Sequence, residues 1–107
     1  MSGKGDLMGR VSSEDLQVMS AFFKIMGDPT RLKILTELLG GSLCVMHISE
    51  RVGMSQSATS HQLAILRRAD LVRVTRKGKS VVYSISDEHV RLMLDMAMLH
   101  VTEEKAR

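Results

Sequence analysis

The hydrophobic period of this chain changes within its second half, and that change constrains the fold most. Up to about residue 69, apolar residues recur every three or four positions, as on one face of an α-helix. Over residues 72–85 they alternate with polar residues, as in β-strands, and Gly78 stands where a hairpin turn needs a positive φ. After residue 87 the helical period returns. The pattern predicts a mainly α fold with one small β-hairpin.

Capping and breaking residues divide the helical part. Asp28 followed by Pro29 is typical of a helix start, because proline at the first helical position loses no hydrogen bond. Gly53 separates a short third helix from a fourth one. The helices expected from these signals cover about residues 13–26, 29–39, 46–52, 56–69 and 87–104.

The length of 107 residues fits one domain and not two. Residues 1–11 are rich in glycine and lack apolar periodicity, so we expect a flexible segment there and a single domain over 12–107. A single cysteine, Cys44, excludes an intramolecular disulfide framework. The sequence has neither an apolar run long enough to span a membrane nor an export signal. We therefore expect a cytoplasmic protein without membrane contact.

The basic character of the chain is concentrated in one third of it. The net charge is +3, yet residues 51–83 carry seven lysines and arginines against Asp70 alone, and the flanking segments are slightly acidic. One interpretation is that this basic block simply forms a surface exposed to solvent. Such a block is also the electrostatic footprint of a protein that binds a polyanion.

The order helix, glycine turn, helix and basic hairpin is that of a winged helix-turn-helix. Apolar residues on both sides of Gly53 would lock two crossed helices. Small polar residues open the fourth helix, where hydroxyls and helix N–H groups can bind phosphate and glutamine can pair with adenine. The candidate DNA-binding residues are Ser55, Gln56, Ser57, Ser60 and His61 on this helix and Arg76, Lys77 and Lys79 at the hairpin tip.

Three segments make the chain resemble the ArsR/SmtB family of metal-sensing repressors over residues 16–104. They are Gly27–Leu32, Ser55–Leu63 and the hairpin from Leu71 to Ile85. The resemblance implies a homodimer, with dimerisation helices at both ends of the domain, that represses an operator until a signal releases it. It also implies that Gln56, Ser57, Ser60 and His61 face DNA. Thr59 stands where an aliphatic residue is commoner, and its hydroxyl needs a hydrogen-bond partner.

The last helix carries two pairs of metal ligands. Asp87 and His89 stand at its start, and His100 and Glu103 eleven or more residues later. At 1.5 Å per residue the two histidines are about 16 Å apart, so one chain cannot hold an ion with both. In an antiparallel pair of these helices, each end of one helix would meet the opposite end of its partner. Two inter-subunit sites would result, each with Asp87 and His89 of one chain and His100 and Glu103 of the other.

Two nitrogen and two oxygen ligands without thiolate suit tetrahedral Zn(II). The resemblance supports this, because zinc-sensing members of that family carry Asp-x-His and His-x-x-Glu/His on the C-terminal helix. It also implies that the ring nitrogen of His100 that does not bind metal forms a hydrogen bond to the backbone near Arg68–Asp70. The sequence thus predicts a homodimeric repressor that is released from operator DNA by Zn(II) as regulatory ligand.

Three other interpretations remain open. The carboxylate–histidine pairs can be solvated, and the input can be Co(II), Ni(II) or a non-metal signal. A zinc hydrolase is disfavoured, because four protein ligands leave no open position for a catalytic water. We therefore expect no enzyme activity.

Soft-metal and metalloid sensing is disfavoured as well. Relatives with that function use a Cys-x-Cys pair at the start of the third helix, whereas this chain has Cys44 and, two positions later, Met46. We interpret Cys44 as a small buried apolar residue. Its spacing to His47 leaves accessory metal binding open.

Overall fold

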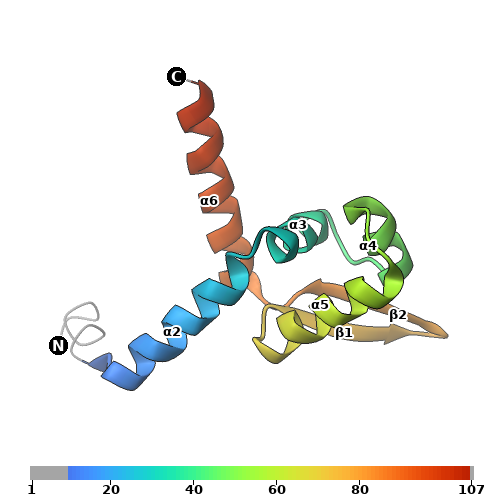
Figure 1. Cartoon of the computed structure of the whole chain (residues 1–107), viewed down its shortest axis with the longest axis horizontal. Helices are drawn as coiled ribbons and strands as arrows, with labels where there is room; N and C mark the ends of the chain where they lie inside the picture. The colour runs from blue at the N-terminus through green and yellow to red at the C-terminus, as the bar shows by residue number, and fades with distance from the viewer. Residues whose placement is uncertain (1–9, 107) are drawn as a thin grey trace.

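The computed structural model describes residues 10–106, with side chains described for residues 10–103. The expected flexible segment 1–11 therefore lies almost wholly outside the described residues. In chain order the elements are α2 (Ser13–Met26), α3 (Pro29–Leu38), α4 (Val45–Val52), α5 (Gln56–Arg68), β1 (Val72–Lys77), β2 (Ser80–Ile85) and α6 (Glu88–Ala106) (Figure 1). The prediction of a mainly α domain with one hairpin is confirmed.

The helix starts follow from local capping. Ser12 caps α2 in a reciprocal arrangement with Asp15, each side chain accepting from the backbone N–H of the other residue. Asp28 caps α3 by accepting from the Arg31 N–H at 3.1 Å, with Pro29 at the first helical position as predicted. Gly53 ends α4 with φ of 71° and ψ of 38°, a left-handed conformation that favours glycine.

The hairpin has the predicted alternation. Val72 pairs with Ile85 and Val74 with Tyr83, so the apolar side chains of both strands share one face. Gly78 lies in the two-residue turn with φ of 63°. A further backbone bridge joins Leu43, just before α4, to Tyr83. The sequence did not indicate this bridge, because a single paired residue leaves no periodic pattern.

The core lies where α3, α4, α5, the hairpin and the start of α6 meet. Twelve apolar side chains are buried there: Ile34, Leu35, Leu38, Ile48, Val52, Leu63, Leu66, Leu71, Val72, Ile85, Val90 and Leu94. By helical spacing the sequence predicts that Ala58 and Leu32 face inward, and both predictions were wrong. Ala58 is exposed while its neighbour Thr59 is fully buried, and Leu32 is 37% exposed while Ile34 takes its place in the core.

Two helices extend beyond this core. Figure 1 shows α2 and the C-terminal part of α6 projecting away from the other elements in different directions. No residue of α2 is buried, and in α6 only Val90 and Leu94 belong to the core. The radius of gyration is accordingly 16.0 Å, against about 13 Å for a compact domain of this size. Within residues 10–106, no helix is both long and apolar enough to cross a membrane.

Candidate functional site

The helix-turn-helix is formed by α4, the Gly53 turn and α5. Ile48 and Val52 of α4 are buried in the core, and so are Leu63 and Leu66 of α5. The backbone N–H of Met54 donates to Ser49 across the glycine turn at 3.0 Å. These contacts fix the angle at which α5 leaves the turn. They therefore also determine which side of α5 is exposed.

The exposed start of α5 carries most of the residues predicted to bind DNA. Gln56, Ser57, Ser60 and His61 are all exposed, while Thr59 on the opposite face is buried. The Ser55 hydroxyl caps the helix by accepting from the Ala58 N–H at 3.0 Å. The helix therefore presents a continuous polar surface together with its N-terminal N–H groups, the arrangement that binds phosphate and base edges.

The buried hydroxyl of Thr59 has a partner. It donates to the Ser55 carbonyl at 2.8 Å, one turn earlier in α5. The polar atom that the sequence places in the core is thus satisfied without disturbing the exposed face.

Basic side chains continue this surface on both sides. Arg76, Lys77 and Lys79 are exposed at the hairpin tip, and Arg67 and Arg68 are exposed at the end of α5. Figure 1 shows the hairpin lying alongside α5 and reaching past the α4–α5 turn. The surface combines a polar helix start with flanking cations, a combination suited to the phosphates and grooves of duplex DNA.

The start of α6 brings two of the four predicted metal ligands together. The Nδ1 atom of His89 lies 3.7 Å from the Oδ1 atom of Asp87, with side chains that are 91% and 57% exposed. The backbone N–H of Val90 donates to the same Oδ1 at 3.0 Å and lowers the pKa of Asp87. Desolvation opposes this shift, and the neighbouring His89 ring adds to it when that ring is protonated. The exposed Asp87 side chain is a carboxylate at neutral pH, the form that binds a cation, and the lowered pKa extends this form to more acidic conditions.

The other two predicted ligands lie farther along the same helix. His100 and Glu103 are exposed on the projecting part of α6. Among the described residues of one chain, no cluster of three or more histidine, cysteine, aspartate or glutamate side chains forms that could hold a metal. One subunit thus supplies the two halves of the predicted ligand set at separate ends of α6.

Cys44 is less buried than expected, and its side chain makes no capping hydrogen bond. It is half-buried and is the N-cap residue of α4. Its Sγ atom lies 3.5 Å from the Nδ1 atom of His47, as their spacing of one helical turn allows.

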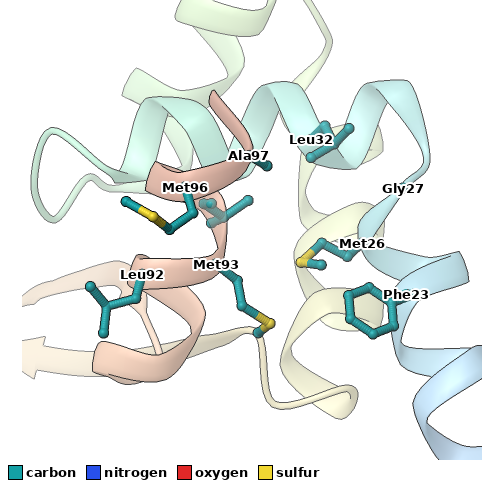
Figure 2. Close-up of a pocket in the computed structure, with 9 residues that line it drawn as sticks. Phe23, Met26, Gly27, Leu32, Leu92, Met93, Met96 and Ala97 are labelled. Atoms are coloured by element: carbon teal, nitrogen blue, oxygen red, sulfur yellow. The ribbon is translucent and has the colours of Figure 1, made fainter. Parts of the chain in front are cut away.

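An apolar pocket separates the two projecting helices. It has a volume of about 580 Å³ and lies between the end of α2, the start of α3 and the middle of α6. Figure 2 shows Met93 of α6 pointing toward Met26 and Phe23 of α2. Large apolar side chains are exposed along both helices, and Phe23, Leu92 and Met96 among them also line the pocket. They are Leu16, Val18, Met19 and Phe23 on α2, and Leu92, Met96, Met98, Leu99 and Val101 on α6.

Two hydrogen bonds near α5 were missed by the sequence analysis. Arg31 of α3 donates from Nε to the Oε1 atom of Gln62 at 2.9 Å, and the hydroxyl of Ser86 donates to the carbonyl oxygen of Asp70 at 2.6 Å. Both join residues distant in sequence, and neither follows from spacing or periodicity.

Comparison with known proteins agrees with this architecture. Residues 28–74 match the model of the family described as bacterial regulatory protein, arsR family. The HTH-type transcriptional regulator NmtR of Mycobacterium tuberculosis is 39% identical over 94% of this chain and 83% of its own length. The transcriptional repressor SmtB homolog of Synechocystis is 38% identical over 87% of this chain and 70% of its own length.

Solved structures agree as well. The crystal structure of the AntR antimony-specific transcriptional repressor superposes with a TM-score of 0.78 at 31% identity, covering 100% of this chain and 99% of the other. NmtR, the SmtB homolog and AntR are all transcriptional regulators. The chain therefore belongs to the ArsR family of bacterial regulatory proteins, as a winged helix-turn-helix DNA-binding regulator and not an enzyme.

Proposed function

We propose that this chain is a homodimeric repressor that binds operator DNA and is released by Zn(II) held between its two C-terminal helices. The observation that carries the proposal is the placement of the metal-ligand pairs. Asp87 and His89 begin α6, His100 and Glu103 lie near its end, and all four side chains are exposed.

The dimer is supported by the apolar surfaces of α2 and α6. Nine of the eleven large apolar side chains that are exposed among the described residues lie on these two helices, and such grouping of exposed apolar side chains marks an interaction surface. Met93 and Met96 lie near the middle of α6, halfway between the two ligand pairs. An antiparallel α6 pair would bury these methionines at its centre and bring Asp87 and His89 of each chain near His100 and Glu103 of its partner.

The donor set fits a zinc ion. The carboxylate of Asp87 is kept ionised, and His89 is almost fully exposed beside it. Two imidazoles and two carboxylates match the four-coordinate preference of Zn(II). Ligands from both chains would fix the two α6 helices relative to each other. Because each α6 is joined to a DNA-binding core, the spacing between the two α5 helices, the proposed recognition helices, depends on that arrangement.

Operator contact is assigned to the exposed surface of α5 and the hairpin tip. Gln56, Ser57, Ser60 and His61 would enter the major groove, with the Ser55 hydroxyl at its edge. Arg76, Lys77 and Lys79 would reach flanking phosphates or the minor groove. AntR, which has the same fold, is an antimony-specific repressor, and this supports an inorganic effector for the present chain.

Fluorescence anisotropy of operator DNA with and without Zn(II) tests the proposal. Wild-type protein should lose operator affinity by about ten-fold or more on adding zinc, within the usual range of allosteric coupling. His89→Ala and His100→Asn should bind operator normally but fail to respond. His47→Ala, which alters a histidine outside α6, is the matched control and should respond as wild type does.

Two results would contradict the proposal. If zinc releases the His89→Ala protein from operator DNA as it releases wild type, α6 does not form the sensing site. A Co(II)-substituted protein with an octahedral spectrum would favour a Co(II) or Ni(II) sensor, whereas a tetrahedral spectrum supports the four-ligand zinc site.

A further inference from the structure

Ser86 ties the start of α6 to the end of α5. Its hydroxyl donates to the Asp70 carbonyl at 2.6 Å, and its backbone N–H donates to the Leu71 carbonyl at 3.1 Å. The first of these distances lies at the short end of the range for O–H···O hydrogen bonds. A residue of the β2–α6 junction is thus bonded twice to the turn that ends the recognition helix.

That turn is rigidly attached to α5. Asp70 has a φ of 58°, and the flanking N–H groups close the turn onto the helix: Asp70 donates to Arg67 at 3.0 Å and Leu71 donates to Leu66 at 2.9 Å. Leu66 and Leu71 are fully buried. A displacement of the Asp70 carbonyl is therefore passed to α5 and is not absorbed within the turn.

On its other side, Ser86 is attached to the proposed metal ligands. It is bonded covalently to Asp87, whose carboxylate accepts the Val90 N–H and lies 3.7 Å from His89. A rearrangement of this first turn of α6 reaches the Ser86 backbone through a single peptide unit. Ser86 is the point at which the segment carrying two ligands touches the recognition-helix turn.

We propose that Ser86 is a positioning residue that transmits metal occupancy at Asp87 and His89 to α5. The inference rests on the proposed function, since it concerns regulation of the same site. The Ser86–Asp70 bond requires the first turn of α6 and the last turn of α5 to keep one relative position. A change in α6 imposed by metal ligation is therefore converted into a change in the position of α5.

The test compares wild type with Ser86→Ala, which removes the hydroxyl but leaves the backbone bond to Leu71. Operator affinity is measured with and without Zn(II), zinc affinity by competition with a chromogenic chelator, and folding by thermal unfolding. Ser86→Ala should bind operator and zinc within about two-fold of wild type. Its loss of operator affinity on zinc addition should be about three- to ten-fold smaller, as expected for one hydrogen bond.

Two variants complete the experiment. Ser86→Thr keeps a hydroxyl at the same position and should restore the zinc response. Ser84→Ala removes a hydroxyl from β2 two residues earlier and should leave the response unchanged.

The outcomes separate this inference from the proposed function. A wild-type protein that ignores zinc would overturn both. A responsive wild type with an equally responsive Ser86→Ala protein would overturn only the role of Ser86. Loss of zinc affinity or of metal-free operator binding in Ser86→Ala would also overturn it, because Ser86 would then support the site or the fold and not the link between them.

Discussion

Arg31 and Gln62 join α3 to the recognition helix, with 2.9 Å between Nε and Oε1. The Nη1 atom of the same guanidinium lies 3.4 Å from the Ile25 carbonyl near the end of α2. One half-buried side chain thus connects a helix of the proposed dimer interface to α5, the proposed DNA-recognition helix. The position of α5 depends on this contact as well as on the apolar core beneath it.

Replacing Arg31 by alanine should therefore weaken both folding and DNA binding. The loss leaves Gln62 without a charged partner and should lower the free energy of unfolding by about 1–3 kcal/mol, measured by urea denaturation. Operator affinity should fall as well. Arg51→Ala is the control, because its 3.4 Å ion pair with Glu37 is solvent-exposed and contributes at most about 1 kcal/mol. Equal effects of the two substitutions would contradict this role for Arg31.

The turn of the helix-turn-helix gives a second prediction. A Cβ at Gly53 would meet no atom within 4 Å, so the cost of Gly53→Ala comes only from its φ of 71°. We expect a destabilisation of about 1–2 kcal/mol by urea denaturation. Gly40→Ala places a Cβ at an ordinary 3.6 Å from the Glu37 carbonyl, without a positive φ, and should be nearly neutral. A destabilisation by Gly40→Ala that matches that of Gly53→Ala would show that φ is not the cause.

The fold could be predicted from the sequence because its signals are local. The change of period, the Asp28-Pro29 start and the glycine turns each act within a few residues, and the structure has all three. The predicted inward faces of α3 and α5 differ from the observed ones by one or two residues. Periodicity defines a face only to within one or two residues. Thr59 can be buried without an unsatisfied polar atom because the Ser55 carbonyl accepts its hydroxyl, a contact that no hydrophobic pattern contains.

For the candidate site, the sequence predicts which residues take part but not the contacts that hold them in position. The exposed polar start of α5 follows from its sequence, and so does the separation of the two ligand pairs along α6. The links through Arg31 and Ser86 could not be predicted, since each depends on how close two distant segments lie. The apolar residues of α2 recur with the helical period, yet none of them is fully buried in a single chain. A hydrophobic pattern does not distinguish a core from an interface.

The lowered pKa of Asp87 predicts a pH dependence of stability. Because the folded pKa lies below the unfolded value of about 3.9, the carboxylate stabilises the fold above that pH. This contribution is lost as the pH falls through the folded pKa. Asp87→Asn should therefore be less stable than wild type at pH 7, and the difference should shrink as the pH falls below the unfolded pKa. Acid unfolding followed by circular dichroism measures it.

Asp95→Asn is the control for that experiment, since Asp95 lies in the middle of α6 and is exposed. It should follow the wild-type acid unfolding curve closely. A difference between wild type and Asp87→Asn that persists unchanged to pH 2 would contradict the capping role of the Asp87 carboxylate.

The hairpin tip should contribute to DNA binding through charge. Lys79→Ala should weaken binding to all DNA sequences alike and reduce the slope of log affinity against log salt by about one for each wing that contacts a phosphate. Lys24→Ala removes the same charge from the last turn of α2, away from the hairpin, and should leave the slope unchanged. A salt titration of operator and non-operator duplexes measures both. If Lys79→Ala leaves this slope unchanged, the hairpin tip does not contact DNA phosphates.

The exposed apolar surface of α6 gives a prediction about assembly. Met96 is 58% exposed in a single chain and lies near the centre of the proposed antiparallel contact. Met96→Glu would place a charge in that contact on each subunit, and an unpaired buried charge is strongly unfavourable. Sedimentation velocity over a concentration series should show dimerisation weakened by at least about ten-fold, with the helical circular dichroism signal retained. Met46→Glu, at a 47% exposed methionine of α4, should leave the dimer intact. A Met96→Glu protein that dimerises as wild type does would exclude the α6 surface as the subunit interface, and with it the convergence of ligands from two chains.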